Sequence, residues 1–442
     1  MPEIASPSAS TLTPAKTARQ RTDTFTSIWM MIAVAMALAT LVDKSRMPQP
    51  LWTMIHLVTL GVLSNGIFQW SWFFARSLAR LSADDPRARR HNTIRVLIFN
   101  AFFASLFVSM WLGWMVGTVI AATGIAAVAA WHGAEMLSVL RERLASRFVV
   151  VVRYYVCSAS FFVLAALLAS FVTATMFSPS IPEAMVAMRD RLTLAHALSG
   201  VAGWVGLTIG GTVITLGPTI LRTRMSPDAV SGGVRVLLPW CLSLLLAITG
   251  ALLGVMPLVG AGILAVGACA IVGIVYPYAK VLRNKGPREY SAWSFLLGLL
   301  WISVGVCALG VAALFVSTPS QLRALTLMWL PIIGIAGFAQ LFQGALSYLM
   351  PVVIGGGPSI VRIGIAIIDW QFPLRLGLRN SALILELFLF FAGDSTSVHV
   401  LRMAGWFLVI ATFVIDVVIY AKTGVTQARA RRARSETLSE SR

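Results

Sequence analysis

Charged side chains are scarce in this chain of 442 residues, where Asp, Glu, Lys and Arg together make up 12%. A soluble domain typically carries about 25% charged residues. Hydrophobic residues make up 58% instead, which excludes a soluble globular protein. The composition indicates a membrane protein built from apolar helices, with the lipid bilayer as its surroundings.

Acidic residues are the scarcer charged kind, with 17 Asp and Glu against 35 Lys and Arg, for a net charge of +18. If the N-terminus is inside, 29 of the 35 basic residues fall in inside segments and 6 fall in outside segments. The positive-inside rule therefore predicts that both termini are cytoplasmic, in the plasma membrane. Anionic lipid headgroups explain the basic loops, so no nucleic-acid partner is expected.

Cysteine is rare as well, and the four residues Cys157, Cys241, Cys269 and Cys307 stand in four separate apolar runs with no CxxC pair. We interpret them as small apolar residues within the bilayer rather than as metal ligands.

Long apolar runs are what the sequence does contain. We expect an all-α, polytopic membrane protein with about twelve transmembrane helices, because each run is long enough to cross the hydrocarbon core. A disordered cytoplasmic tail is expected at 1–24, the membrane domain at 25–421 and a basic cytoplasmic tail at 422–442, disordered from 427. The expected helices are 25–43, 51–75, 94–112, 114–137, 148–177, 192–217, 234–253, 256–279, 292–316, 325–351, 373–393 and 401–421.

Two of these helices share a glycine pattern. At an offset of 134 positions, Gly200 falls on Gly334, Gly203 on Gly337 and Gly210 on Gly344. A looser copy occupies 51–72, where His56 lies 140 positions before His196. The pattern predicts three four-helix pseudo-repeats, although shared composition alone is the alternative explanation.

His56 and His196 are the main candidates for a site, because the repeat puts both in the outer third of the membrane. Imidazole is a common ligand of copper, iron and zinc. Buried histidines also form hydrogen bonds between membrane helices, and that reading stays open. The third copy has Leu330 at the matching position, followed by a polar stripe of Gln340, Gln343 and Ser347.

Other polar residues are candidates for carrying protons or lining a polar pore. His132 and Glu135 stand three apart on one helix face, as a proton-entry or metal pair or as a plain interfacial pair. Glu386 and Asp416 are carboxylates within apolar runs, where charge is costly and by default functional. His91, among the arginines of a basic loop, is expected to be solvated.

Taken together, twelve helices, a threefold repeat and histidines on helices two and six resemble subunit I of the haem-copper oxidases. The chain is more similar to their diverged relatives, the NnrS-type membrane proteins, and to the membrane part of some actinobacterial multicopper oxidases and copper nitrite reductases. The resemblance rests on the stretches HLVTLGVLSNGIFQW (56–70), AHALSGVAGWVGLTIGGTVITLGPTILRTRM (195–225) and QGALSYLMPVVIGGGP (343–358).

The departures from that family are informative. The oxidases hold their haems and copper through histidines of helices two, six, seven and ten, and here helices seven and ten have none. The family's tyrosine four residues after the histidine of helix six is Gly200 here. An oxygen-reducing centre cannot be assembled from this set, so no oxidase or nitric-oxide reductase activity of the familiar kind is expected.

The resemblance thus implies a degenerate member of the fold that binds one haem b or one copper ion through His56 and His196. It would serve nitrogen-oxide or copper handling, with a redox or membrane-protein partner. A copper site would need a third donor, for which His399 is on the correct side. The rival readings are a secondary transporter and a non-catalytic assembly subunit.

Overall fold

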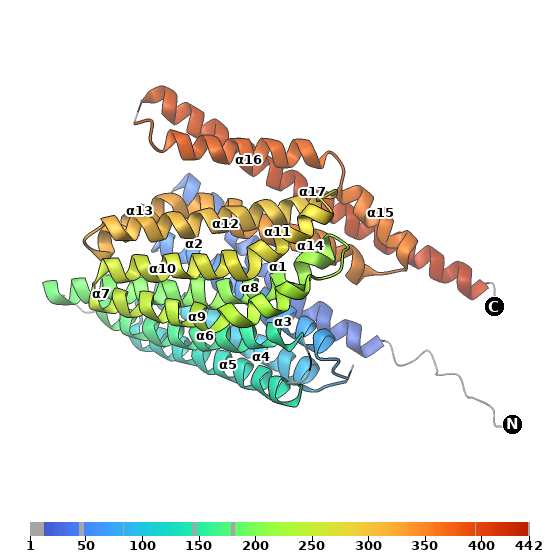
Figure 1. The fold of residues 1–442 in the computed structure, drawn as a ribbon, viewed down its shortest axis with the longest axis horizontal. Helices are drawn as coiled ribbons and strands as arrows, with labels where there is room; N and C mark the ends of the chain where they lie inside the picture. The colour runs from blue at the N-terminus through green and yellow to red at the C-terminus, as the bar shows by residue number, and fades with distance from the viewer. Residues whose placement is uncertain are drawn as a thin grey trace. The chain divides into compact units, whose positions relative to one another are not determined.

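A computed structural model describes residues 13–43, 48–82, 84–143, 146, 148–177, 182–393 and 395–440, and every regular element within them is helical (Figure 1). A helix satisfies its own backbone N–H and C=O groups, as a hydrocarbon environment requires. Among the described residues, ten helices are long and apolar enough to cross a membrane. The protein is therefore an all-α, multi-pass membrane protein.

The chain forms two compact units. Unit 1 consists of Met1–Ile214, Val230–Cys269 and Ala313–Ser320, and unit 2 of Thr215–Ala229, Ala270–Ala312 and Gln321–Arg442.

Unit 1 contains the helices from the N-terminus to the first part of α8, together with most of α9 and α10. Its elements are α1 (Thr13–Val42), α2 (Pro50–His56), η3 (Leu57–Ser64), α3 (Asn65–Leu78), η4 (Arg87–His91), α4 (Asn92–Trp111), α5 (Met115–Glu142), α6 (Val149–Met176), α7 (Glu183–Ala197), η5 (Leu198–Gly206), the first part of α8 (Leu207–Ile220), most of α9 (Pro227–Leu253) and nearly all of α10 (Met256–Ala270).

Unit 2 contains the helices of the C-terminal part. Its elements are η6 (Ile271–Val275), α11 (Tyr276–Asn284), most of α12 (Tyr290–Phe315), most of α13 (Pro319–Ile332), η7 (Ile333–Ala339), α14 (Gln340–Ile354), α15 (Pro358–Ile368), α16 (Phe372–Leu389) and α17 (Thr396–Glu440).

Ten of the twelve expected spans coincide with long apolar helices. The other two expected spans are less apolar. The apolar part of α1 is only Phe25–Thr40, and α16 carries the charged residues Arg375, Arg379 and Glu386. Twelve spans, and cytoplasmic termini, therefore stay predictions.

Two helices begin earlier than expected. α1 starts at Thr13, within the segment expected to be a disordered tail, of which residues 1–12 lie outside the described part. α7 starts at Glu183, within the expected outer loop 178–191. Hydropathy marks the part of a helix that lies in lipid, and a polar first turn continues the helix beyond it.

The prediction that residues 427–442 are disordered is wrong for the described part, since α17 continues to Glu440. Side chains of this segment bind the turn after α14. Arg431 Nη1 donates to the carbonyl oxygen of Ile354 at 2.8 Å, and Arg434 Nη1 donates to that of Gly356 at 3.2 Å. Gly355, Gly356 and Gly357 of this turn all have positive φ angles, which glycine adopts without strain. Residues 427–440 are rich in Ala, Arg, Gln and Glu, which favour a helix, and these contacts hold that helix against the turn.

The three helices predicted to be repeats each contain a π-helical segment: η3, η5 and η7. These segments begin one residue after His56, two after His196 and three after Leu330. Two more π-helical segments, η4 and η6, occur elsewhere in the described residues. Such wide turns often mark functional sites, because they break the regular hydrogen-bond ladder.

Aromatic rings fill the centre of unit 1. Phe162 of α6 stacks on Trp204 of η5, with ring centres 4.7 Å apart and planes at 13°. Phe68 of α3 lies 5.4 Å from Trp204 and 5.0 Å from Phe99 of α4. One ring cluster therefore joins four segments of the unit.

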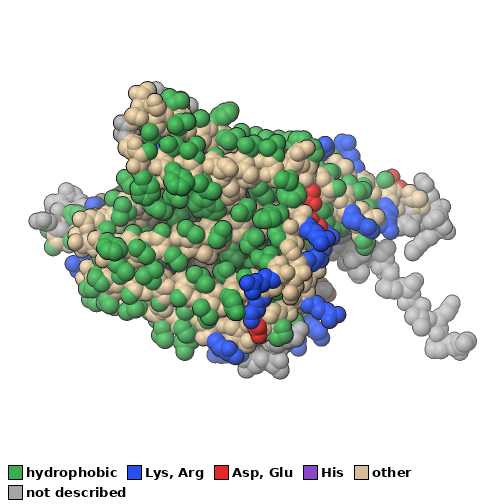
Figure 2. All heavy atoms as spheres, turned by 45° about the horizontal axis from the view of Figure 1, so that its top comes forward, with side chains coloured by type: hydrophobic (Ala, Val, Ile, Leu, Met, Phe, Trp, Pro, Cys, Tyr) green, Lys and Arg blue, Asp and Glu red, His purple; other side chains and the backbone are tan. Residues whose placement is uncertain are grey.

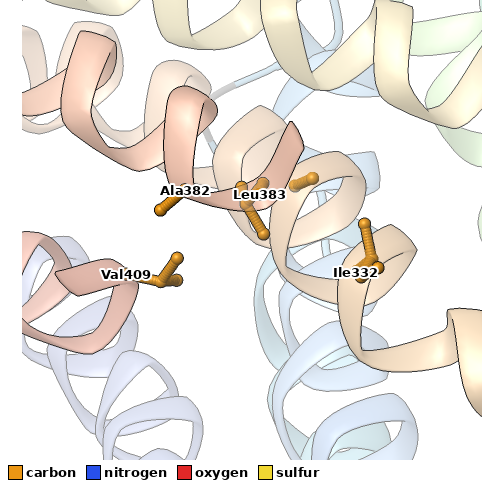
Figure 3. Packing of buried hydrophobic residues seen from close by; sticks show 5 residues of the cluster. Ile332, Ala382, Leu383 and Val409 are labelled. Atoms are coloured by element: carbon orange, nitrogen blue, oxygen red, sulfur yellow. The ribbon is translucent and has the colours of Figure 1, made fainter. Parts of the chain in front are cut away.

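In unit 2, aliphatic residues join α13, η7, α16 and α17. Ile332, Ala336, Ala382, Leu383 and Val409 form one buried cluster (Figure 3).

Side chains on the outer surface of the helices are mostly hydrophobic (Figure 2), as contact with lipid requires. Leu238, for example, is 66% exposed.

Candidate functional site

The structure brings His56 and His196 together within unit 1. His56 is the last residue of α2, and His196 stands one residue before the end of α7. Their ring centres are 6.1 Å apart and their planes differ by 17°. Stacked rings in direct contact approach more closely, since carbon atoms touch at about 3.5–4.0 Å. The pair is therefore near-parallel and separated by more than a contact distance.

Hydrogen bonds fix the tautomer of both imidazoles. The Nδ1 atom of His56 lies 2.8 Å from the carbonyl oxygen of Trp52, and that of His196 lies 2.8 Å from the carbonyl oxygen of Ala165. A carbonyl oxygen only accepts, so each Nδ1 carries the proton and each Nε2 keeps its lone pair. Metal-binding histidines are oriented in this way by their second nitrogen.

The neighbouring contacts show that the two helices run parallel beside each other. Trp204 Nε1 donates to Ser64 Oγ at 2.9 Å, and this pair is separated by 140 positions, like the two histidines. His56 also stacks on Trp52, with ring centres 4.3 Å apart. Both His56 and His196 are half-buried.

The third predicted metal donor, His399, is on α17 in unit 2 and is exposed. No group of three or more His, Cys, Asp or Glu side chains suited to a metal ion occurs among the described residues. Within unit 1, the histidine pair is thus a two-ligand arrangement.

His132 and Glu135 lie on one helix but have different partners. His132 is fully buried, and its Nε2 lies 3.3 Å from Ser71 Oγ. Glu135 forms an ion pair with Arg95 and lies 2.7 Å from His91 Nδ1. The expectation that His91 is a loop histidine is wrong, because His91 ends η4 and pairs with Glu135, but its side chain is still 40% exposed. The basic segment thus supplies partners for Glu135.

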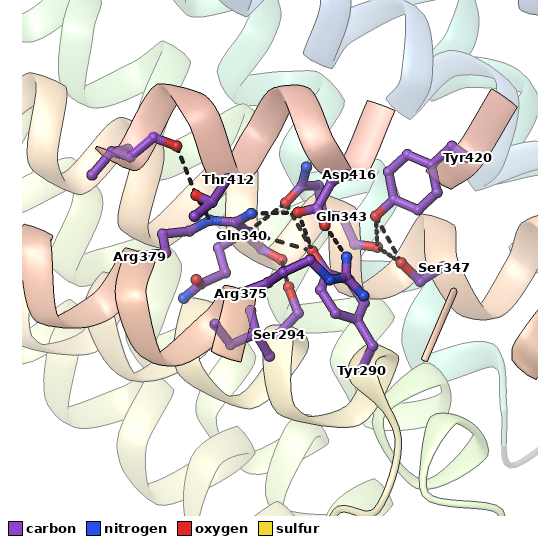
Figure 4. Close-up of polar contacts among 12 residues, drawn as sticks. Tyr290, Ser294, Gln340, Gln343, Ser347, Arg375, Arg379, Thr412, Asp416 and Tyr420 are labelled. Atoms are coloured by element: carbon purple, nitrogen blue, oxygen red, sulfur yellow. Dashed lines mark hydrogen bonds and ion pairs between the residues drawn. The ribbon is translucent and has the colours of Figure 1, made fainter. Parts of the chain in front are cut away.

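Unit 2 contains a buried polar network that joins four helices (Figure 4). Its centre is Asp416 of α17, which is 0% exposed. The Asp416 carboxylate forms ion pairs with Arg375 and Arg379 of α16. It also accepts a hydrogen bond from the hydroxyl of Tyr290 of α12 at 2.7 Å.

The fourth helix, α14, enters this network through its polar stripe. Gln343 Oε1 accepts hydrogen bonds from Arg379 Nη1 at 2.9 Å and from the Tyr290 hydroxyl at 3.2 Å. Gln340 pairs with Asn380, whose Nδ2 donates to Gln340 Oε1 at 3.0 Å. The stripe therefore faces protein and is bonded to it.

The remaining polar groups of the two arginines are also used. Arg379 Nε donates to Thr412 Oγ1 at 3.0 Å, and Arg375 Nε donates to the carbonyl oxygen of Trp370 at 3.0 Å. Nearby, Asp369 accepts the backbone N–H of Tyr290 at 2.8 Å, and burial raises the pKa of its carboxyl. A saturated network of this kind holds helices together rather than offering an open binding site.

Sequence reasoning missed Arg375 and Arg379, because both were counted as charges of an inside loop. Their spacing of four residues places them on one face of α16, ahead of an apolar run. This spacing, together with a carboxylate within the apolar run at Asp416, was the signal in the sequence that could have predicted a buried ion pair.

Glu386 lies on α16 two turns beyond Arg379. It is 5% exposed, so its side chain is buried within the protein. A Cβ atom added at Gly405 of α17 would lie 2.3 Å from its Oε1. That oxygen has no hydrogen-bond partner among the described residues.

No protein-family model matches the chain, and no curated protein is similar to it. The reading of its function therefore rests on the geometry above.

Proposed function

We propose that this multi-pass membrane protein holds one haem b, or one copper ion, between His56 and His196, and that it serves nitrogen-oxide or copper handling. The observation that carries the proposal is the matched tautomer of the two imidazoles. Each has its Nδ1–H bonded to a backbone carbonyl, and each therefore has its Nε2 lone pair available to a metal.

His56 and His196 would hold the metal through their Nε2 atoms, because both Nδ1 atoms are bonded to carbonyl oxygens. Their ring centres are 6.1 Å apart, so the two side chains are near enough to share one metal. Haem b would take these two histidines as its protein ligands, and they are the pair that unit 1 brings together.

Copper would need a third donor, because two neutral ligands hold a bare ion weakly. His399 is the residue predicted for that role, and it belongs to unit 2. Haem is for this reason the better supported of the two groups.

Bound haem b would supply one-electron transfer. The chain's own contribution is to hold the ligands ready. The carbonyl oxygens of Trp52 and Ala165 fix the orientation of the imidazoles, and the indole of Trp52 covers one of them. The missing oxidase histidines argue against oxygen reduction, and the resemblance to NnrS-type proteins supports nitrogen-oxide or copper handling with a redox or membrane partner.

The same proposal places the chain in the plasma membrane with both termini cytoplasmic, on the strength of its basic inside segments. Reporter fusions in the expected inside segment 280–291 and in the expected outside connection 316–318, between α12 and α13, test this. Labelling of the 280–291 segment from outside intact cells would contradict it.

An optical spectrum and metal analysis of the purified protein test the cofactor. We expect haem b at about one per chain, with both His56→Ala and His196→Ala losing it. His91→Ala is the matched control, because that histidine is bonded to Glu135 instead. Loss of copper in His399→Ala would identify the copper form. A wild-type protein with neither haem nor copper refutes the proposal.

A secondary transporter, or a non-catalytic assembly subunit, is the alternative in that event. The observation that favours transport is Glu386, a buried carboxyl with one unpartnered oxygen among the described residues. Intramembrane carboxylates of this kind carry protons in transporters. Proton uptake by proteoliposomes that is lost in Glu386→Gln would support this alternative.

A further inference from the structure

Three buried nitrogen atoms of unit 1 lack a hydrogen-bond partner among the described residues. They are Trp72 Nε1, Arg95 Nε and His132 Nδ1, and the three side chains are 1%, 0% and 0% exposed. Buried polar groups are nearly always paired with protein or with ordered water. Three orphan atoms in one place therefore point to a ligand.

The three side chains are neighbours on α3, α4 and α5. The guanidinium carbon of Arg95 lies 5.2 Å from the ring centre of Trp72. The rings of Trp72 and His132 are 6.3 Å apart, at 87°. Phe68 and Trp204 close the site on other sides of His132, with ring centres at 4.9 and 6.1 Å.

The donors decide the chemistry of the ligand. An indole N–H and a guanidinium Nε–H only donate, so the ligand must accept. His132 Nδ1 donates or accepts, depending on the proton on its Nε2 beside Ser71. A water molecule accepts from the first two groups with its two lone pairs and donates to His132 Nδ1, in the tautomer whose proton is on Nε2.

Charge argues for water over an anion. The groups facing the site are Arg95 of α4 and Glu135 of α5, which form an ion pair, with His91 on the far side of Glu135. An added anion would have no free positive charge to balance it, and a buried unpaired charge is costly.

We propose that Trp72, Arg95 and His132 bind buried water, and that this water carries protons between Glu135 and His132. His91 is 40% exposed and Glu135 is 13% exposed, so the route opens at the end of the helices. The route ends at His132, because the Ser71 hydroxyl beside its Nε2 donates to the carbonyl oxygen of Phe68, which cannot take a proton onward. This site is separate from the His56–His196 pair and does not depend on a cofactor.

X-ray radiolytic footprinting tests the water, since bound water yields hydroxyl radicals that oxidise the side chains beside it. We expect Trp72 and His132 to be labelled several-fold faster than Tyr154, with ¹⁸O incorporated from H₂¹⁸O. Tyr154 of α6 is the matched control, because it is 0% exposed and its hydroxyl donates to the carbonyl oxygen of Gly233 at 2.9 Å. Labelling of Trp72 and His132 no faster than Tyr154 overturns the proposal.

Hydrogen exchange of the indole N–H groups tests the proton route in ¹⁵N-tryptophan-labelled protein. The N–H of Trp72 should exchange faster than that of Trp204, and Glu135→Gln should slow it several-fold. Retained protection of Trp204 shows that the variant is folded. Exchange of Trp72 that is unchanged in the folded Glu135→Gln variant overturns the route, and His91→Ala repeats the test if Glu135→Gln does not fold.

Discussion

Asp416→Asn is the change that the unit 2 network makes most informative. Asn has nearly the same size as Asp, so packing is kept while the negative charge is lost. Arg375 and Arg379, 4% and 0% exposed, would then be left without their carboxylate partner. The substitution therefore isolates the electrostatic part of the contact.

The magnitude follows from the burial of all three groups. Removing one partner of a buried ion pair costs about 3–5 kcal/mol, because the other charge stays buried and uncompensated. At about 1.36 kcal/mol per factor of ten, the unfolding equilibrium constant should rise roughly 10²- to 10⁴-fold. Arg379 keeps its hydrogen bond to Gln343 Oε1, and the Tyr290 hydroxyl can still donate to the side-chain oxygen at position 416, so we expect the effect toward the lower end.

Reversible unfolding in detergent, followed by tryptophan fluorescence, measures this change. Glu386→Gln is the matched control, since this buried carboxyl is in no ion pair among the described residues and should cost far less. Replacing Arg375 and Arg379 by Met together with Asp416→Leu should recover most of the loss, because an apolar substitute for the whole group avoids the buried charges. An Asp416→Asn variant within about 1 kcal/mol of wild type would refute the reasoning.

Two further outcomes are expected. Gly344→Ala should destabilise the protein by about 1–3 kcal/mol, because the new Cβ would clash with the backbone nitrogen of Phe295, whereas Gly334→Ala, with nothing within 4 Å, should not. Equal unfolding curves for the two variants would contradict this packing. Hydrogen bonds from Arg87 lower the pKa of the Asp85 carboxyl in the folded protein. This contact therefore stabilises the fold above about pH 4, and its stabilisation is lost as the pH falls through the folded pKa. The unfolding midpoint of Asp85→Asn, measured against pH, should lack that part of the pH dependence.

The helices could be predicted from the sequence because each apolar run must satisfy its own backbone in lipid. The 140-position offset of the repeat placed His56 and His196 at a similar depth, but it left open whether the two side chains would meet. The fixed tautomers could not be predicted, because the carbonyl oxygens of Trp52 and Ala165 become partners only when the helices pack.

Charged residues were the harder part. Arg375 and Arg379 look like ordinary positive charges at the end of a span until Asp416 comes to face them. Glu135 and His132 share a helix face, yet the partners of Glu135 are Arg95 and His91, which come from another segment. Hydropathy carries no information about such pairings, since they depend on which helices are neighbours.

The length of α17 has a mechanical consequence. Its 45 residues, at about 1.5 Å each, give a rod of roughly 67 Å, more than twice the approximately 30 Å of a hydrocarbon core. Arg431 and Arg434 brace this rod against the glycine turn that follows α14. A displacement of its polar end would therefore pass through this brace and along one continuous helix to Asp416, at the centre of the unit 2 network.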